Sequence, residues 1–340
     1  MASGPGRVST LSSPSGDKTE AEPSSQSHWA LSSYLVKRLR ICTFNVENLF
    51  TRFRFHRSLT EDDHRRLIRD GWETEDMFAT RHDDPHANLV AQALAEVDAD
   101  IVALQEIESL DTLKRFNRNQ LSDLGYQYAM CIDGNDYRGI DVGILSRLPF
   151  LYMRSHQWDE RTDRPGEPVF GRDCLEVDVL LPSGRTLTVY INHFKSIAGN
   201  RDKTMHRRRL QSVRMAEIIR ERFGDDPSEG RWIIVGDLND YMPSDGLAPL
   251  LGLPWLENVV DRLPADLRWT HHYAPDDEVH QLDYILPSRA IADANPDSMP
   301  IIERRGLPLR TESYSGPRFP SGDPDSKASD HCPLAWDFII

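Results

Sequence analysis

Long apolar runs are missing from this chain of 340 residues. Its longest aliphatic stretches, such as Ile233 to Val235, are far shorter than the ~20 residues that a membrane-spanning helix requires. A secretory leader is not expected either, because the segment 30–36 is interrupted by serines and continues into the basic segment 37–40. The sequence therefore predicts neither a transmembrane segment nor secretion by that route.

Cysteine is scarce, and the few thiols are far apart. The four cysteines are Cys42, Cys131, Cys174 and Cys332, which form no CxxC pair for zinc and no dense disulfide framework. Three other catalytic signatures are missing, namely the HExxH zinc motif, the GxSxG nucleophile elbow and the GxxxxGK phosphate loop. We therefore expect reduced thiols and a cytoplasmic protein.

The chain also lacks a basic excess. It carries 40 Lys and Arg residues against 54 Asp and Glu residues, a formal net charge of −14. This acidity excludes general coating of nucleic acid, because non-specific binding needs Lys and Arg to neutralise phosphates. The acids can still serve an enzyme that acts on phosphate if they are concentrated where they hold a metal ion.

The composition is that of a globular protein with a tail. Apolar residues make up 39% of the chain and charged residues 28%, which suits a folded core. Ser, Pro and Gly make up half of residues 1–28, and such a segment cannot bury enough surface to offset its ordering entropy. A prior of ~150 residues per domain suggests two domains, but no linker interrupts the rest of the chain. We expect a disordered tail over 1–39 and a single domain over 40–340.

Short apolar runs that stop at polar residues dominate after the tail. Because these runs are rich in β-branched residues, they predict buried strands. Polar side chains at the ends of such strands are held on a rigid scaffold, where they can face a cleft. The predicted strands cover residues 41–44, 101–104, 187–191, 232–235, 281–286 and 332–338.

Helices are fewer than strands. Apolar residues recur at helical spacing over 86–97 and over 201–222, which predicts two helices. The polar segment 51–85 is expected to be an inserted excursion with a helix near Glu61–Arg69. The proline-rich segment 287–329 is expected to be a loop before the last strand.

The polar residues at the strand ends suit phosphate-ester chemistry. Mg²⁺ takes oxygen ligands from one or two carboxylates plus substrate phosphate, and an attacking water must be oriented and deprotonated. Asp283 lies in an apolar run where an unpaired carboxylate is costly, so we expect it to pair with His331. Taken singly, these residues could equally be solvated strand ends, Asx turns or structural histidines. The candidates are Asn45, Glu106, His193, Asp237, Asn239, Asp283, Asp330 and His331.

Six short blocks follow one another along the chain after residue 40. They are Thr43-Phe44-Asn45-Val46-Glu47-Asn48, Leu104-Gln105-Glu106, Asn192-His193-Phe194-Lys195-Ser196, Gly236-Asp237-Leu238-Asn239-Asp240, Leu282-Asp283-Tyr284 and Ser329-Asp330-His331. In content and order these blocks resemble the endonuclease/exonuclease/phosphatase superfamily, which includes pancreatic deoxyribonuclease. The resemblance implies an α/β (α+β) fold, a four-layered deoxyribonuclease-like β-sandwich of two mixed sheets flanked by helices.

The resemblance also implies a metal site and a nucleophile site. Glu106 resembles the main ligand of Mg²⁺ or Mn²⁺, with Asn45 beside it and Asp330 as a second carboxylate on the metal side. Asp237 and Asn239 resemble the residues that orient the nucleophile and the scissile phosphate.

Further residues resemble the family's acid–base and substrate groups. His193 resembles a histidine that binds a phosphoryl oxygen or serves as an acid, and Asp283 with His331 resembles a polarised dyad. The candidate substrate-binding residues are Lys195, Arg138 and Asp141.

We therefore expect a metal-dependent phosphoesterase that uses water as nucleophile and forms no covalent enzyme intermediate. A nuclease acting on nucleic acid is the first hypothesis, and a phosphatase or phosphodiesterase acting on small or lipid-linked esters is the second. A non-catalytic binding protein that keeps the fold is the alternative from another class. The Arg207-Arg208-Arg209 run is expected to be a solvated helix face, and residues 201–222, with 8 basic and 3 acidic residues, would be where a polynucleotide docks.

Overall fold

The computed structural model describes residues 38–340 apart from 75–76, 82–84 and 321–322. All of these residues belong to one compact unit, Val36–Ile340. The predicted tail over 1–39 lies outside the described residues except for its last two positions, so its disorder stays a prediction. Among the described residues, no helix is both long and apolar enough to cross a membrane.

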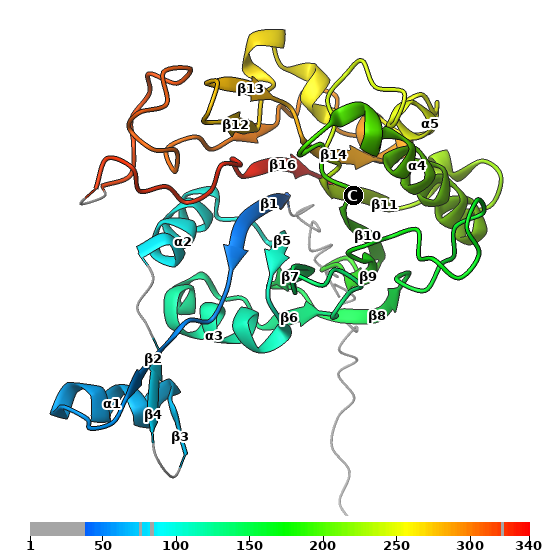
Figure 1. Cartoon of the computed structure of the whole chain (residues 1–340). Helices are drawn as coiled ribbons and strands as arrows, with labels where there is room; N and C mark the ends of the chain where they lie inside the picture. Colours follow the sequence, from blue (N-terminus) through cyan, green and yellow to red (C-terminus); the bar gives the residue numbers. More distant parts are fainter. Residues whose placement is uncertain (1–37, 75–76, 82–84, 321–322) are drawn as a thin grey trace, which may run out of the picture. The chain divides into compact units, whose positions relative to one another are not determined.

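Two mixed β-sheets form the centre of this unit (Figure 1). The larger sheet has the order β15 (Ile301–Ile302), β16 (Leu334–Phe338), β1 (Leu39–Leu49), β5 (Ile101–Ile107), β7 (Asp141–Ser146) and β6 (Tyr128–Cys131). The smaller sheet has the order β14 (Asp283–Pro287), β11 (Trp232–Asp237), β10 (Thr186–His193), β9 (Cys174–Leu180) and β8 (Phe150–Ser155).

Each sheet contains one parallel pair of strands in an otherwise antiparallel arrangement. These pairs are β1 with β5 and β10 with β11. In a parallel pair the carboxyl ends of both strands lie at the same edge of the sheet. Asn45 is therefore level with Gln105, and His193 is level with Asp237. This register gathers the polar strand ends at one edge of each sheet.

Three hydrophobic clusters separate four layers. The central cluster joins the facing sides of the two sheets through aliphatic residues such as Ile144 and Val189. The outer clusters pack helices against the outer sides of the sheets: α2 (Pro85–Val97) and α3 (Leu110–Gln120) on the larger sheet, and α4 (Arg201–Phe223) and α5 (Ala248–Leu251) on the smaller. The four-layered α/β sandwich with helices on both sides is therefore confirmed.

The predicted strands and helices are present, with bounds that shift by a few residues. The excursion contains the predicted helix, α1 (Glu61–Asp70), which begins at a capping box between Thr60 and Asp63. It also contains a three-stranded sheet that the sequence did not predict. The remaining elements are β2 (Phe53–His56), β3 (Trp72–Glu73), β4 (Phe78–Arg81), β12 (His271–Tyr273), β13 (Glu278–His280), α6 (Arg289–Asp293), η1 (Ser122–Leu124), η2 (Pro227–Glu229), η3 (Val259–Arg262) and η4 (Ala265–Leu267).

The arginine run on α4 is not the solvated face that the sequence predicted. Arg208 is fully buried, and its Nε lies 2.9 Å from Asp240 Oδ2. Arg207 is half-buried and donates to the carbonyl of Pro168, which leaves Arg209 as the exposed member of the run. The expectation was wrong because Arg208 pairs with a carboxylate 32 positions away, which the local charge pattern does not reveal.

Candidate active site

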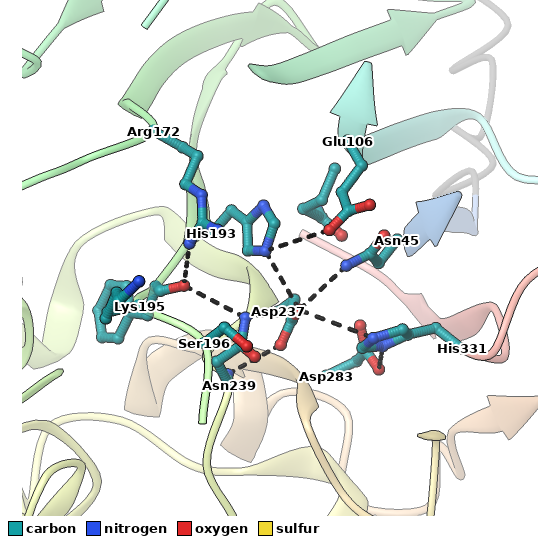
Figure 2. A network of polar contacts seen from close by, with 12 residues as sticks. Asn45, Glu106, Arg172, His193, Lys195, Ser196, Asp237, Asn239, Asp283 and His331 are labelled. Atoms are coloured by element: carbon teal, nitrogen blue, oxygen red, sulfur yellow. Dashed lines mark hydrogen bonds and ion pairs between the residues drawn. The ribbon is translucent and has the colours of Figure 1, made fainter. Parts of the chain in front are cut away.

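A backbone irregularity at the end of β5 sets the direction of Glu106. The register of β5 against β7 shifts between Gln105 and Ile107, so Glu106 is an extra residue in the strand, and its φ is 66°. The neighbouring strand β1 shifts register just after Asn45. Bulges of this kind re-aim a side chain, and positive φ is uncommon at a residue other than Gly. Figure 2 shows the Glu106 carboxylate turned toward His193.

Asp237 links the two sheets at the end of β11. Its Oδ2 accepts hydrogen bonds from Asn45 Nδ2 at 3.1 Å and from Asn239 Nδ2 at 2.8 Å, and its Oδ1 accepts from the Asn239 backbone N–H at 2.8 Å (Figure 2). Gly236 makes this position possible, because its φ is 140° and an added Cβ would lie 2.0 Å from the Asn192 carbonyl oxygen. Only glycine lets β11 approach β10 this closely.

Asp283 and His331 form the pair that the sequence predicted. His331 Nδ1 lies 2.8 Å from Asp283 Oδ2, and the same oxygen accepts the Thr270 hydroxyl at 2.7 Å. Asp283 is the first residue of β14 rather than an interior residue, and it is fully buried. Burial opposes the charged imidazole, but the carboxylates of Asp283 and Asp237 raise the pKa of His331 well above its ordinary value.

His193 lies between the carboxylates of the two sheets. Its Nε2 is 3.4 Å from Asp237 Oδ2 and 3.9 Å from Glu106 Oε1. Burial, reinforced by the positive charge of Arg172, lowers the pKa of His193 well below its ordinary value, so the ring is neutral. Burial also raises the pKa of Glu106, and it raises the pKa of Asp237 to about 7. The carboxylates of Glu106 and Asp237 therefore have too little positive charge around them to offset their burial.

Two arginines bring positive charge to the neighbourhood of these acids. Arg172 is only 3% exposed, donates to the Phe194 carbonyl at 2.7 Å and has Asp136 Oδ2 2.9 Å from its Nε. Arg138 is exposed and also binds Asp136. One carboxylate therefore positions both guanidinium groups.

A cleft of ≈ 680 Å³ collects most of the predicted residues. Those that line it are Asn45, Glu106, Arg138, His193, Asp237, Asn239, Asp330 and His331. Asp283 lies behind His331 and reaches the cleft only through it. Lys195 is exposed but does not line the cleft, and Asp141 is buried with its Oδ1 accepting the Gly134 backbone N–H at 2.7 Å.

The sequence missed several residues of this cleft. Arg172 precedes β9 in a segment with no motif, and His271 lies in a short hairpin strand that apolar periodicity does not predict. Glu47 was inside a recognised block but had no role, and it accepts the Asp330 backbone N–H at 3.0 Å and Lys327 Nζ at 2.7 Å. Local patterns in one sequence do not indicate a role for such residues, because only the tertiary fold brings them to the site.

The donor set suits a divalent cation. Glu106 and Asp237 are carboxylates whose pKa values burial raises, so a cation beside them would compensate charge that the protein leaves unbalanced. Asn45 is less free to act as a ligand, since its Oδ1 already accepts the Glu47 backbone N–H at 3.0 Å. Among the described residues, two triplets offer one ligand atom each within 4.8 Å of one another: Asp237, Asp283 and His331, and His271, Asp330 and His331.

Comparison with known sequences decides the family. The Endonuclease/Exonuclease/phosphatase family profile matches residues 42–331, which span every predicted site residue. The chain belongs to the Endonuclease/Exonuclease/phosphatase family. Members of this family are phosphoester hydrolases, and divalent metals are their general cofactors. No curated protein matches the sequence.

Solved structures share the fold of this family member. Truncated TDP2 from Caenorhabditis elegans is 14% identical, with a TM-score of 0.56 over 89% of this chain and 98% of that chain. The mannosyl-6-phosphatase Bt3783 of Bacteroides thetaiotaomicron is 16% identical, with a TM-score of 0.55 over 89% and 100%. SmcL is 19% identical, with a TM-score of 0.54 over 89% and 99%. At these identities the likeness shows the fold alone.

Proposed function

We propose that this family member is a divalent-metal-dependent hydrolase that cleaves phosphodiester bonds by direct attack of water. The observation that carries the proposal is the meeting of carboxylates and imidazoles from both sheets in one cleft that Arg172 also lines. Water needs a base, the phosphoryl oxygens need positive charge and the leaving group needs an acid. Each of these groups is available within the cleft.

Glu106 and Asp330 would hold Mg²⁺ or Mn²⁺, with Asn45 beside them. A bound divalent cation supplies positive charge to the phosphoryl oxygens and lowers the barrier to displacement. The bulge at Glu106 supports this assignment, because it fixes the carboxylate in a conformation that an ordinary strand would not give.

Asp237 would orient the attacking water and take its proton. With a pKa of about 7, part of the Asp237 population is ionised at neutral pH and can accept a proton, and three hydrogen bonds from Asn45 and Asn239 hold its oxygens. Asn239 would fix the direction of the Asp237 carboxylate, because its amide group donates to Asp237 and to the Phe194 carbonyl, and His193 would donate to a phosphoryl oxygen. His331, kept protonated by Asp283, would stabilise the negative charge or protonate the leaving oxygen.

Substrate phosphate would contact the cationic wall. Arg138 and Arg172 line the cleft, and the pKa of Lys195 is lowered by burial and also by the positive charge of Arg172 nearby. Asp141 supports the loop at Gly134, so its predicted role in substrate binding would be exerted through that loop.

Nucleic acid is the first candidate substrate, and a small phosphate ester is the second. The second candidate is favoured by α4, where Arg208 is buried and Arg214 is bound by Asp159 and Glu221, so part of the positive charge of this helix is already neutralised within the protein. The cations of the cleft are enough to recognise one phosphate group.

A substrate panel tests both parts of the proposal. Plasmid DNA, single-stranded DNA, RNA, a sugar phosphate and sphingomyelin are each incubated with Mg²⁺, Mn²⁺ or EDTA. We expect turnover with metal and none in EDTA, and we expect Glu106→Gln to lose at least about 10²-fold in kcat because the amide lacks the ligand charge. Glu229→Gln, at an exposed glutamate outside the cleft, is the matched control. Equal turnover in EDTA would exclude the metal-dependent mechanism.

A further inference from the structure

His271, Asp330 and His331 form a cluster at one side of the cleft. The three residues offer one ligand atom each, all within 4.8 Å of one another. His271 Nε2 lies 3.9 Å from Asp330 Oδ2, which is too long for a hydrogen bond. The two imidazole rings have centroids 4.7 Å apart. Side chains this close without direct bonds leave room for a bridging ion.

Backbone hydrogen bonds hold the cluster in place. His271 and His331 are opposite each other in an isolated antiparallel bridge. On either side of that bridge, Cys332 N–H donates to the Thr270 carbonyl at 2.6 Å and His272 N–H donates to the Asp330 carbonyl at 2.9 Å. The three side chains are therefore presented by one ladder, and little conformational entropy would be lost when they bind a ligand.

The imidazole nitrogens have the orientation that metal ligation needs. His331 uses Nδ1 for Asp283, so Nε2 is the nitrogen left to face the cleft, and a metal ion that binds there displaces the Nε2 proton. A carboxylate on the far nitrogen is the usual support of a metal-binding histidine. His271 Nδ1 is buried and has no hydrogen-bond partner among the described residues, so neither nitrogen of this ring is committed to the protein.

We propose that His271, Asp330 and His331 bind a transition-metal ion such as Zn²⁺, and that this ion inhibits the enzyme by occupying His331 Nε2. Two imidazoles and one carboxylate favour Zn²⁺ over Mg²⁺, which prefers oxygen ligands. Ligand atoms ~2.1 Å from a tetrahedral zinc ion lie roughly 3.4 Å apart, so the 3.9 Å between His271 and Asp330 requires a closure of about half an ångström, and no pair of the cluster, all within 4.8 Å, requires more than ~1.4 Å. The inhibition, but not the binding, rests on the proposed function.

This site differs from the proposed Mg²⁺ position. Glu106 is not a member of the cluster among the described residues, and it comes from β5, whereas His271 comes from β12. Asp330 is the one residue that both positions would use. Zn²⁺ at the cluster therefore withdraws one Mg²⁺ ligand and the His331 imidazole together.

Direct metal binding tests the site independently of activity. The full chain is titrated with Zn²⁺ in excess Mg²⁺ by calorimetry, and with Co²⁺ by visible absorption, for wild type, His271→Ala, His271→Gln, Glu106→Gln and the control His206→Ala at an exposed histidine. We expect wild type, Glu106→Gln and His206→Ala to bind, and both His271 variants to lose at least about tenfold in Zn²⁺ affinity and the Co²⁺ ligand-field bands. Unchanged Zn²⁺ affinity in folded His271 variants would overturn the site.

The inhibitory role is read from turnover relative to each variant's own rate in Mg²⁺. Wild type should be inhibited at the Zn²⁺ concentration that fills the site, and His271→Ala only at a concentration at least about tenfold higher. Inhibition of both at the same concentration would refute the role of the site in inhibition. If no Mg²⁺-dependent turnover exists at all, the proposed function fails, while the binding titration still decides whether the metal site exists.

Discussion

The Asp283–His331 pair gives the sharpest test of the proposed mechanism. The pair is buried, His331 Nδ1 is 2.8 Å from Asp283 Oδ2, and His331 Nε2 is 3.8 Å from Asp237 Oδ2. A positioned acid or base contributes ~10²–10⁴-fold to a rate. We therefore expect His331→Ala and Asp283→Asn each to lower kcat by at least about 10²-fold. Because Asp283 reaches the cleft only through His331, the double variant should be little slower than His331→Ala.

Stability must be measured in parallel, because the pair is inside the protein. Removing one partner of a buried ion pair costs about 3–5 kcal/mol, and Asp283 also holds the Thr270 hydroxyl. Thermal unfolding of each variant sets an assay temperature at which all are folded. The loss in kcat at that temperature then reports chemistry rather than unfolding.

The chain offers a matched control for this cycle. His206 Nε2 lies 2.8 Å from Asp163 Oδ2, the same separation as in the buried pair, but His206 is 59% exposed and outside the cleft. The two single variants and the double variant of this pair should leave kcat unchanged within about twofold, because an exposed pair contributes little. If the losses at Asp283 and His331 multiply, the two residues act independently and the dyad does not exist in function.

Three further predictions concern charge, backbone and the basic helix. Burial raises the Asp237 pKa to about 7, so between the ordinary carboxyl pKa and pH 7 the folded protein keeps a proton that the unfolded chain releases, and stability falls as the pH rises through this range. Mg²⁺ should therefore raise the Tm more at pH 8 than at pH 5.5, and equal Tm shifts in calorimetry would contradict this. Gly236→Ala meets a neighbouring carbonyl at 2.0 Å whereas Gly184→Ala meets nothing, so urea unfolding should show Gly236→Ala to be less stable than Gly184→Ala by at least about 2 kcal/mol. Arg208→Ala should lower the free energy of unfolding by about 1.5–3 kcal/mol, because it removes a buried, charged hydrogen bond to Asp240 while Arg201 still pairs with that carboxylate, whereas Arg209→Ala should change it little; comparable losses would show that burial of Arg208 is not what matters.

Local signals predicted the strands, and the resemblance of the six ordered blocks to a known superfamily supplied the fold class and most of the cleft residues. Apolar runs with polar ends mark strands such as β5 and β11, and parallel pairing then brings Glu106 and Asp237 to neighbouring edges. The Asp283–His331 contact was predictable because a carboxylate in an apolar run needs a partner. These inferences required no knowledge of the loops.

What the sequence could not predict depends on tertiary contacts or on single dihedral angles. The bulge at Glu106 has no residue signature, since glutamate rarely has positive φ. Arg172 and His271 enter the cleft from loops and short strands whose positions follow from packing rather than from periodicity. The burial of Arg208 likewise depends on its pairing with Asp240, 32 positions away in the chain.

The hydrogen bond between Asn45 and Asp237 joins the two sheets at the cleft, so the geometry of the cleft depends on the distance between the sheets. The groups on β1 and β5 keep their distance from those on β10 and β11 only while the central cluster keeps its thickness. Side chains such as Ile144 and Val189, which contact no substrate, therefore set how far apart the two halves of the chemistry lie. Because misplacement by ~1 Å can cost 10²-fold in rate, enlarging or trimming these aliphatic residues should tune turnover from within the sandwich, with the cleft residues themselves unchanged.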